Sequence, residues 1–188
     1  MGVKIARRAA RSLRFRASKA VPAMTAPLLK TASREPAPPF DAALVLATAR
    51  DLLRAGSAGG IPPLLVGRHL CLLGASRRSR EADAFREGAR ELGAQVTALH
   101  PSQLALRTPA DVVRCAGMLS RLYDAVECQG IASELVRQLG AAAEIPVYDG
   151  VGGDGHATAL LAAELDRRAA PAERRRRVLQ AVLANALS

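Results

Sequence analysis

Short apolar runs alternate with longer stretches of helical periodicity through most of the chain. Four runs have the length and composition of strands: His69–Gly74, Gln95–Leu99, Asp124–Cys128 and Ile145–Tyr148. Each is followed by a segment in which apolar positions recur every three or four residues: Arg80–Leu92, Pro109–Leu122, Ile131–Glu144 and His156–Arg168. Because alternating strands and helices are joined by right-handed crossovers, this order predicts an α/β fold, a four-stranded parallel sheet with helices on both faces.

A further helix is expected on each side of this alternating region. Apolar residues recur at helical spacing from Asp41 to Arg54. Pro171 to Leu187 begins with proline and carries its large apolar residues on one side, which predicts a terminal amphipathic helix. The proline-rich joint Glu35 to Phe40 cannot be helical throughout. We therefore expect a basic, disordered arm over residues 1–39, an α/β domain over 40–170 and a C-terminal helix over 171–188.

Composition agrees with one such domain and limits what its core contains. The chain has 188 residues and is 49% hydrophobic but only 3% aromatic, so Ala, Leu and Val must fill the core. Three cysteines without CxxC or Cys/His spacing do not indicate a zinc site, and they favour buried thiols in a reducing compartment: Cys71, Cys115 and Cys128. No segment approaches the ~20 apolar residues of a membrane span.

The excess of positive charge lies in the N-terminal arm. Residues 1–34 hold nine of the 27 basic side chains and no acid, which leaves 18 bases against 17 acids in the rest. A nearly neutral body does not indicate nucleic-acid binding. The arm fits an organellar transit peptide or an over-called start ahead of Met24; we expect a cytoplasmic protein, with an organellar location as the alternative. A second basic run, Arg174–Arg177, is expected on a solvated helix face, or else in contact with an acidic partner.

The loop after the first expected strand is the main candidate for chemistry. It reads Gly74-Ala75-Ser76-Arg77-Arg78-Ser79-Arg80 and leads directly into a helix. Hydroxyls, guanidinium groups and the N–H groups of a helix N-terminus all suit an anion of the phosphate type. On these residues alone, Ser76 could equally be an N-cap and the arginines a solvated face. The loop is not a nucleotide fingerprint, because neither GxGxxG nor the P-loop pattern is present.

Three segments match, in the same order, the motifs of one known enzyme family. Residues 76–80, Ser-Arg-Arg-Ser-Arg, are similar to a Ser-Thr-Arg-Thr-Arg phosphate loop; residues 112–124 resemble a Thr-Ala-Arg-Val-Leu-Ser-Arg-Tyr-Asp helix; and residues 145–150 resemble a Val-Pro-Val-x-Asn-Gly strand. These motifs belong to the carbamoyl-phosphate-binding, N-terminal domain of aspartate/ornithine carbamoyltransferases, and the resemblance, of the ornithine type, covers roughly residues 40–166. It implies a Rossmann-like domain from a family of trimeric transferases of amino-acid metabolism, including arginine biosynthesis.

The resemblance also implies a set of ligand contacts. The residues assigned to the phosphate of carbamoyl phosphate, or of another small phosphorylated anion, are Ser76, Arg77 through its backbone, Arg78 and Ser79. Gln103 would reach the ligand of a neighbouring subunit. His156 would donate to the carbamoyl carbonyl oxygen and stabilise negative charge there, as the catalytic residue of this set. Without the resemblance, His156 is a solvent-facing histidine at a helix start. Neither a metal nor a cofactor is implied.

Departures from the family pattern bear on activity. Gln129 stands where the family has an arginine, and Ala159 where it has the glutamine that holds the carbamoyl amino group. Each lost donor typically costs ~2.7–4 kcal/mol of transition-state stabilisation. The family's amino-acid-binding domain has no counterpart after Arg168. We therefore expect a pseudoenzyme that binds carbamoyl phosphate with little turnover. The alternatives are a non-catalytic trimerising or regulatory partner of a full-length carbamoyltransferase and, third, a polyanion-binding protein.

Overall fold

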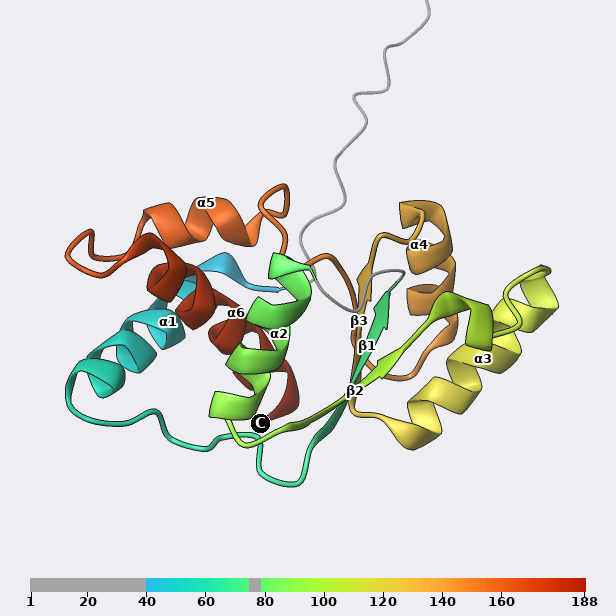
Figure 1. Ribbon diagram of the computed structural model, residues 1–188, viewed down its shortest axis with the longest axis horizontal. Coiled ribbons are helices and arrows are strands. Elements are labelled where there is room, and N and C mark those ends of the chain that lie inside the picture. The colour runs from blue at the N-terminus through green and yellow to red at the C-terminus, as the bar shows by residue number, and fades with distance from the viewer. Residues whose placement is uncertain (1–39, 75–78) are drawn as a thin grey trace, which may run out of the picture. The chain divides into compact units, whose positions relative to one another are not determined.

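The computed structural model describes residues 40–74 and 79–188 of the chain, which are drawn in colour in Figure 1. The basic arm expected over residues 1–39 lies outside the described residues. Ser76, Arg77 and Arg78 of the predicted phosphate loop also lie outside them.

Four parallel strands form one sheet. They are β1 (His69–Gly74), β2 (Gln95–Leu99), β3 (Ala125–Gln129) and β4 (Val147–Asp149), in the order β2-β1-β3-β4. The first two strands match the predicted bounds residue for residue, whereas β3 and β4 are displaced slightly toward the C-terminus. For β4 the reason is Pro146, which has no N–H to donate to a strand ladder. Its carbonyl still accepts a hydrogen bond from Val126, so β4 starts just after it.

The helices begin at capping residues that the sequence supplies. They are α1 (Ala42–Ser57), α2 (Arg80–Glu91), α3 (Pro109–Leu122), α4 (Ser133–Ala142), α5 (Thr158–Ala163) and α6 (Pro171–Leu187), with a short 3₁₀ turn η1 (Pro101–Gln103). The Asp41 carboxylate accepts the first N–H groups of α1, and Thr108 forms a capping box with Asp111 at the start of α3. The helix expected over His156–Arg168 is much shorter and ends at Ala163; further on, the Asp166 side chain accepts the Arg168 N–H, which favours a turn instead of helix there.

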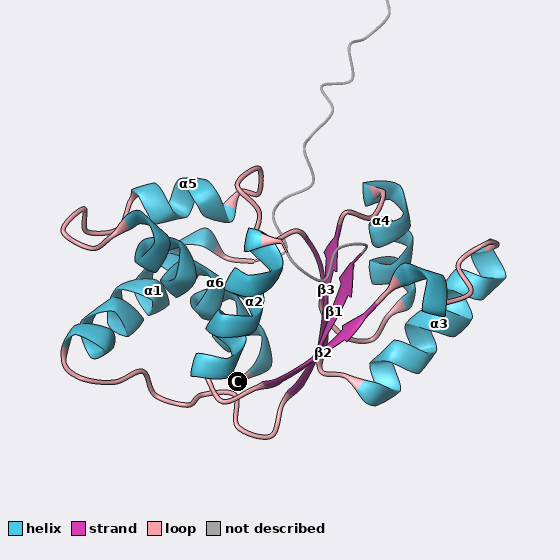
Figure 2. Cartoon of the chain, viewed as in Figure 1, coloured by secondary structure: helices cyan, strands magenta, loops and turns pink. Residues whose placement is uncertain are grey.

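The two faces of the sheet bury different groups of helices. Leu70 and Leu72 of β1 pack in a cluster with α1, α2, α5 and α6, whereas Cys71 and Leu73 pack with α3 and α4. Figure 2 shows the strands between these two groups of helices. The parallel sheet with helices on both faces, predicted from the sequence, is therefore confirmed. Cys71, Cys115 and Cys128 are free and buried, all in the second cluster.

Helix α6 is a central helix of the domain. It contacts α1, α2 and α5, and every residue from Arg177 to Ala184 is buried. The sequence predicts one apolar side; the structure buries the polar side as well. α2 can approach closely because position 88 is glycine, where a Cβ would lie only 2.7 Å from Cδ2 of Leu179. In the described part of the chain, no helix is long and apolar enough to cross a membrane.

Candidate anion site at the strand ends

The carboxyl ends of β1, β3 and β4 all lie at the same end of the sheet, because the strands are parallel. Gly74 is paired with Gln129 in the strand register, so the loops after β1 and β3 start side by side. In the loop after β4, a Cβ on Gly152 would lie 3.1 Å from the Glu81 carbonyl oxygen and 3.9 Å from Nε2 of Gln129. The start of α2, the end of β3 and the loop after β4 are therefore in contact. This is the edge at which open parallel sheets bind their ligands.

Ser79, the described member of the predicted phosphate loop, is the N-cap of α2. Its Oγ accepts a hydrogen bond from the Ala82 N–H at 3.0 Å. The pKa of the Glu81 carboxyl is lowered by a hydrogen bond from its own backbone N–H and next by one from the Ser79 hydroxyl. A carboxylate thus takes donors of the helix N-terminus that an external anion would use.

Gln103 lies apart from this group. It follows β2, the edge strand, which β1 separates from β3 and β4. Its side chain is exposed, and Oε1 accepts the His100 N–H at 2.7 Å to close the turn η1. Its contact with a ligand of a neighbouring subunit stays a prediction.

His156 lies half-buried in the loop between β4 and α5. Its ring is 6.0 Å from that of Phe40, centroid to centroid, with the planes tilted by 44°. Nδ1 is 3.0 Å from Oγ1 of Thr158 and 3.3 Å from the backbone nitrogen of the same residue. The Thr158 hydroxyl is 2.8 Å from the Val151 carbonyl, to which it donates, so Thr158 connects the imidazole to the loop backbone.

The protonation state of His156 suits a hydrogen-bond donor. Burial lowers the pKa of the imidazole; the Asp149 carboxylate opposes this shift and the Arg175 guanidinium adds to it. The ring is therefore mainly neutral at pH 7. Nδ1 has two possible partners on Thr158: it can accept the backbone N–H at 3.3 Å, which puts the hydrogen of a neutral ring on Nε2, or donate to Oγ1 at 3.0 Å.

Glu127, which the sequence analysis did not single out, is buried directly below these loops. Oε1 accepts from Nε2 of Gln129 at 3.1 Å, and Oε2 accepts the Val151 N–H at 3.2 Å. Burial raises the pKa of this carboxyl to about 8, the Gln129 and backbone hydrogen bonds oppose the shift, and the Asp149 charge adds to it. A glutamate inside an otherwise apolar strand was the available signal, because such a residue needs a buried partner.

Arg175 of α6 reaches the same loop from the other side. Nη2 donates to the carbonyls of Gly152 at 3.0 Å and Gly153 at 2.8 Å, and Nη1 forms an ion pair with Asp154 at 3.0 Å. The loop that carries His156 is thus held from β3 and from α6, two elements far apart in the sequence.

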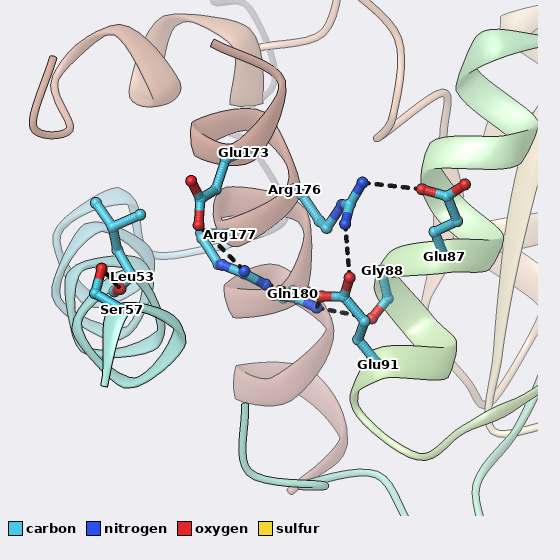
Figure 3. Close-up of polar contacts among 9 residues, drawn as sticks. All are labelled: Leu53, Ser57, Glu87, Gly88, Glu91, Glu173, Arg176, Arg177 and Gln180. Atoms are coloured by element: carbon cyan, nitrogen blue, oxygen red, sulfur yellow. Dashed lines mark hydrogen bonds and ion pairs between the residues drawn. The ribbon is translucent and has the colours of Figure 1, made fainter. Parts of the chain in front are cut away.

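The prediction that Arg174–Arg177 forms a solvated face is wrong. Arg174 donates to the Ala162 carbonyl, and Arg176 and Arg177 bind carboxylates of α2. Figure 3 shows Arg176 and Arg177 of α6 directed at Glu87, Glu91, Glu173 and Gln180. Four consecutive residues of a helix point in directions spread over most of a turn, so they could not all have faced solvent on a helix packed on both sides.

Two clefts lie on this side of the domain. One, of about 430 Å³, opens beside the Gly152 loop between α2 and the start of α6, and is lined by Arg80, Arg175 and Arg176 together with Glu81, Asp83, Glu87 and Asp154. The other, of about 760 Å³, lies between the end of α1 and the start of α6 and, unlike the first, is lined by neither the start of α2 nor the Gly152 loop. The region at the C-terminal ends of the strands, rather than the larger cleft, is therefore the candidate site.

Sequence comparison relates this domain to known transferases. No protein-family model matches the chain. The catabolic ornithine carbamoyltransferases of Burkholderia mallei and Burkholderia pseudomallei are each 33% identical over 118 residues, or 63% of this chain and 35% of theirs. The chain thus spans about a third of the length of these relatives. Because both are catabolic by name, the comparison does not support the predicted link to arginine biosynthesis.

Solved structures show the same fold. The ornithine carbamoyltransferase of Pyrococcus furiosus has a TM-score of 0.57 and 24% identity, covering 65% of this chain and 39% of its own. The catalytic subunit of M. jannaschii aspartate transcarbamoylase has a TM-score of 0.54 and 15% identity, covering 65% and 40%. The fold is a parallel α/β domain, and the candidate site lies at the C-terminal ends of its strands. In sequence the chain is similar to ornithine carbamoyltransferases, in fold it is similar to both ornithine and aspartate carbamoyltransferases, and the similarity covers one domain of these enzymes.

Proposed function

We propose that this domain binds carbamoyl phosphate, or another small phosphorylated anion, at the carboxyl ends of β1, β3 and β4. The observation that carries the proposal is the contact among the start of α2, Gln129 and the Gly152 loop. This contact brings a helix N-terminus to the loop that holds His156, whose imidazole is mainly neutral at pH 7 and is a donor in its Nε2–H form. Backbone N–H groups at a helix start favour a phosphate, and a neutral N–H donor favours a carbonyl oxygen.

The two ends of the ligand would then be bound by different elements. Ser79 and the N-terminus of α2 hold the phosphate, with Ser76, Arg77 and Arg78 from the preceding loop. Phosphate displaces the Glu81 carboxylate from the Ser79 hydroxyl, since a dianion is the stronger acceptor.

Transfer of the carbamoyl group is expected to be slow in this domain. His156 can polarise the carbamoyl carbonyl, but Gln129 supplies no positive charge and Ala159 supplies no amide. Two lost donors at ~2.7–4 kcal/mol each lower the rate by several powers of ten. We therefore propose a cytoplasmic carbamoyltransferase-like domain that binds its anion and transfers little by itself.

Titration calorimetry with carbamoyl phosphate tests the binding site. The wild-type chain is expected to bind, and Arg78→Ala to bind at least tenfold more weakly, because a charge-assisted contact to phosphate is worth about 1.5–3 kcal/mol. Arg90→Ala is the matched control: it removes the same charge from the exposed far end of α2 and is expected to bind like the wild type. Absence of binding heat in the wild type would refute the proposal.

A radiometric carbamoylation assay tests the expected lack of turnover. Purified chain is incubated with labelled carbamoyl phosphate and ornithine, aspartate or related amines. Product is expected at the level of the enzyme-free reaction. Clear turnover by the chain alone would show that Gln129 and Ala159 do not have the cost assigned to them.

A non-catalytic, trimer-forming partner is the second candidate function. The exposed apolar side chains of Val113 and Leu122 on α3 favour it, since they are 60% and 59% exposed in the single chain. Light scattering would then give about 60 kDa, three times the 19.7 kDa chain, or a longer carbamoyltransferase would co-purify. A strict monomer at micromolar concentration would count against this role.

A further inference from the structure

A carboxyl group without a cation lies under the proposed anion site. Glu127 is fully buried, and none of the ion pairs in the described part of the chain involves it. It is bonded to the Gln129 amide and to the Val151 N–H. An ionised carboxylate is expensive to bury without a positive partner, so the fold favours the protonated form.

The Gln129 amide has two possible orientations, and the proton of Glu127 selects between them. In one orientation, which the structure shows, Nε2 donates to Oε1 of Glu127, whereas Oε1 of Gln129 is buried without a partner among the described residues. That orientation suits an ionised Glu127, which can only accept. When Glu127 is protonated, a half-turn of the amide lets the carboxyl O–H donate to the Gln129 oxygen instead. The NH₂ group of Gln129 then occupies the position that the unpaired oxygen held before the half-turn.

The Gln129 amide is part of the strand-end site, where Nε2 would lie 3.9 Å from a Cβ on Gly152. Gln129 is the last residue of β3, is paired with Gly74, and lies against Gly152. An NH₂ group there offers donors to an anion, whereas an amide oxygen repels it. Ionised Glu127 would add a negative charge directly below.

We propose that Glu127 is a proton-dependent positioning residue of the anion site. With its proton, it holds the Gln129 NH₂ group toward the loops and the site binds an anion. Without its proton, it turns the amide oxygen there and binding weakens. The inference rests on the proposed function, since the anion is the ligand of that same site.

Other titratable groups face Glu127 but do not change in the same pH range. On β4, Tyr148 has its pKa raised to about 12 by burial and then by the Glu127 charge. On β3, burial raises the pKa of the Cys128 thiol, and the Glu127 charge adds to the rise. His156 has a lowered pKa and is already neutral. The Asp149 carboxylate and the Arg175 guanidinium are the charged side chains beside these groups. Between pH 7 and 9, Glu127 is thus the group among these that titrates.

NMR spectroscopy of the unliganded protein tests the positioning role without any ligand. In the wild type, the Gln129 side-chain NH₂ and the Val151 amide are expected to shift together, with a midpoint near pH 8. In Glu127→Gln, which resembles the neutral carboxyl in shape, both signals should stay constant from pH 6.5 to 9.5. Glu164→Gln, an exposed glutamate, is the matched control and should titrate like the wild type. A constant wild-type signal, or an equal shift in Glu127→Gln, would overturn the proposal.

Calorimetry at several pH values tests the link to binding. Carbamoyl phosphate and sulfate, which does not titrate in this range, are the probes. Wild-type affinity should fall at least tenfold between pH 7 and 9.5, whereas Glu127→Gln should change less than threefold. If Glu127→Gln does not fold, Gln129→Met is used, and its affinity at pH 7 should fall at least fivefold. Equal affinities of the wild type at both pH values would overturn the inference. If the wild type binds neither anion, the proposed function fails, and the NMR titration still decides the role of Glu127.

Discussion

At the scale of single residues, Glu127 makes the stability of the protein depend on pH. Its pKa is about 8 in the folded chain against an ordinary value of 4.5. Between these values the folded state keeps a proton that the unfolded state releases. The free energy of unfolding therefore falls by up to about 5 kcal/mol as pH rises from 4.5 to 8. Above pH 8 this contribution levels off.

Urea denaturation at pH 5, 7 and 9 measures this contribution. Glu127→Gln is expected to be the more stable protein at pH 9, by a few kcal/mol, and nearly equal to the wild type at pH 5. Glu164→Gln should follow the wild-type curve. The same pH slope in wild type and Glu127→Gln would mean that other groups cause it.

Residues of the site differed in how far the sequence could predict them. His156 and Ser79 were both assigned from motifs of the resemblance, whereas the N-cap position of Ser79 was not predicted, since Ser76 was the residue considered for an N-cap. Glu127 and Arg175 were missed, because their role depends on which segments the fold brings together. A local pattern contains no information on a contact between α6 and a loop more than 20 residues away in the chain.

At the scale of elements, the contact of α6 with α2 depends on two neighbouring arginines in different surroundings. Arg177 has a side chain only 8% exposed and binds Glu91, Glu173 and Gln180, as Figure 3 shows. Arg176 is 33% exposed and binds Glu87 and Glu91. Removing one partner of a buried network leaves unpaired charge, whereas an exposed pair is largely screened by water.

We expect Arg177→Ala to lower the free energy of unfolding by about 3–5 kcal/mol and Arg176→Ala by about 1 kcal/mol or less. Both variants lose one positive charge from the same helix, so each is the control for the other. Urea denaturation at neutral pH measures the difference. Similar losses in the two variants would show that burial of Arg177 does not matter.

Strand positions were predictable because each strand here is a short apolar run bounded by turn residues. The extent of α5 was not predictable, since its periodic pattern continues past Ala163, where the helix ends, and through the turn at Asp166. The burial of both sides of α6 was not predictable either. It depends on Gly88 and on paired polar groups of α2 that face α6 in space.

At the scale of the whole molecule, we propose that residues 171–188 belong to the same folding unit as residues 40–170. Helix α6 supplies Val178, Leu179, Val182 and Leu183 to the core on its face of the sheet. A chain that ends at Ala170 should therefore lose its cooperative thermal transition, as measured by circular dichroism. Ala186→Ser, at an exposed position of the same helix, should melt like the wild type. A cooperative transition in the shortened chain would indicate that α6 is dispensable.

The order of strands has a consequence for how the domain opens. Because β3 lies between β1 and β4, it is paired in a ladder on both sides, whereas the N–H groups of the Gly150–Gly153 turn are bonded individually, to Cys128, to Glu127 and within the turn. Deuterium should therefore enter the turn during brief local fluctuations and enter Glu127 and Cys128 only when the entire domain unfolds. Strand β3 beneath the site would then be its most stable part, and the Gly150–Gly153 turn would be its most mobile part.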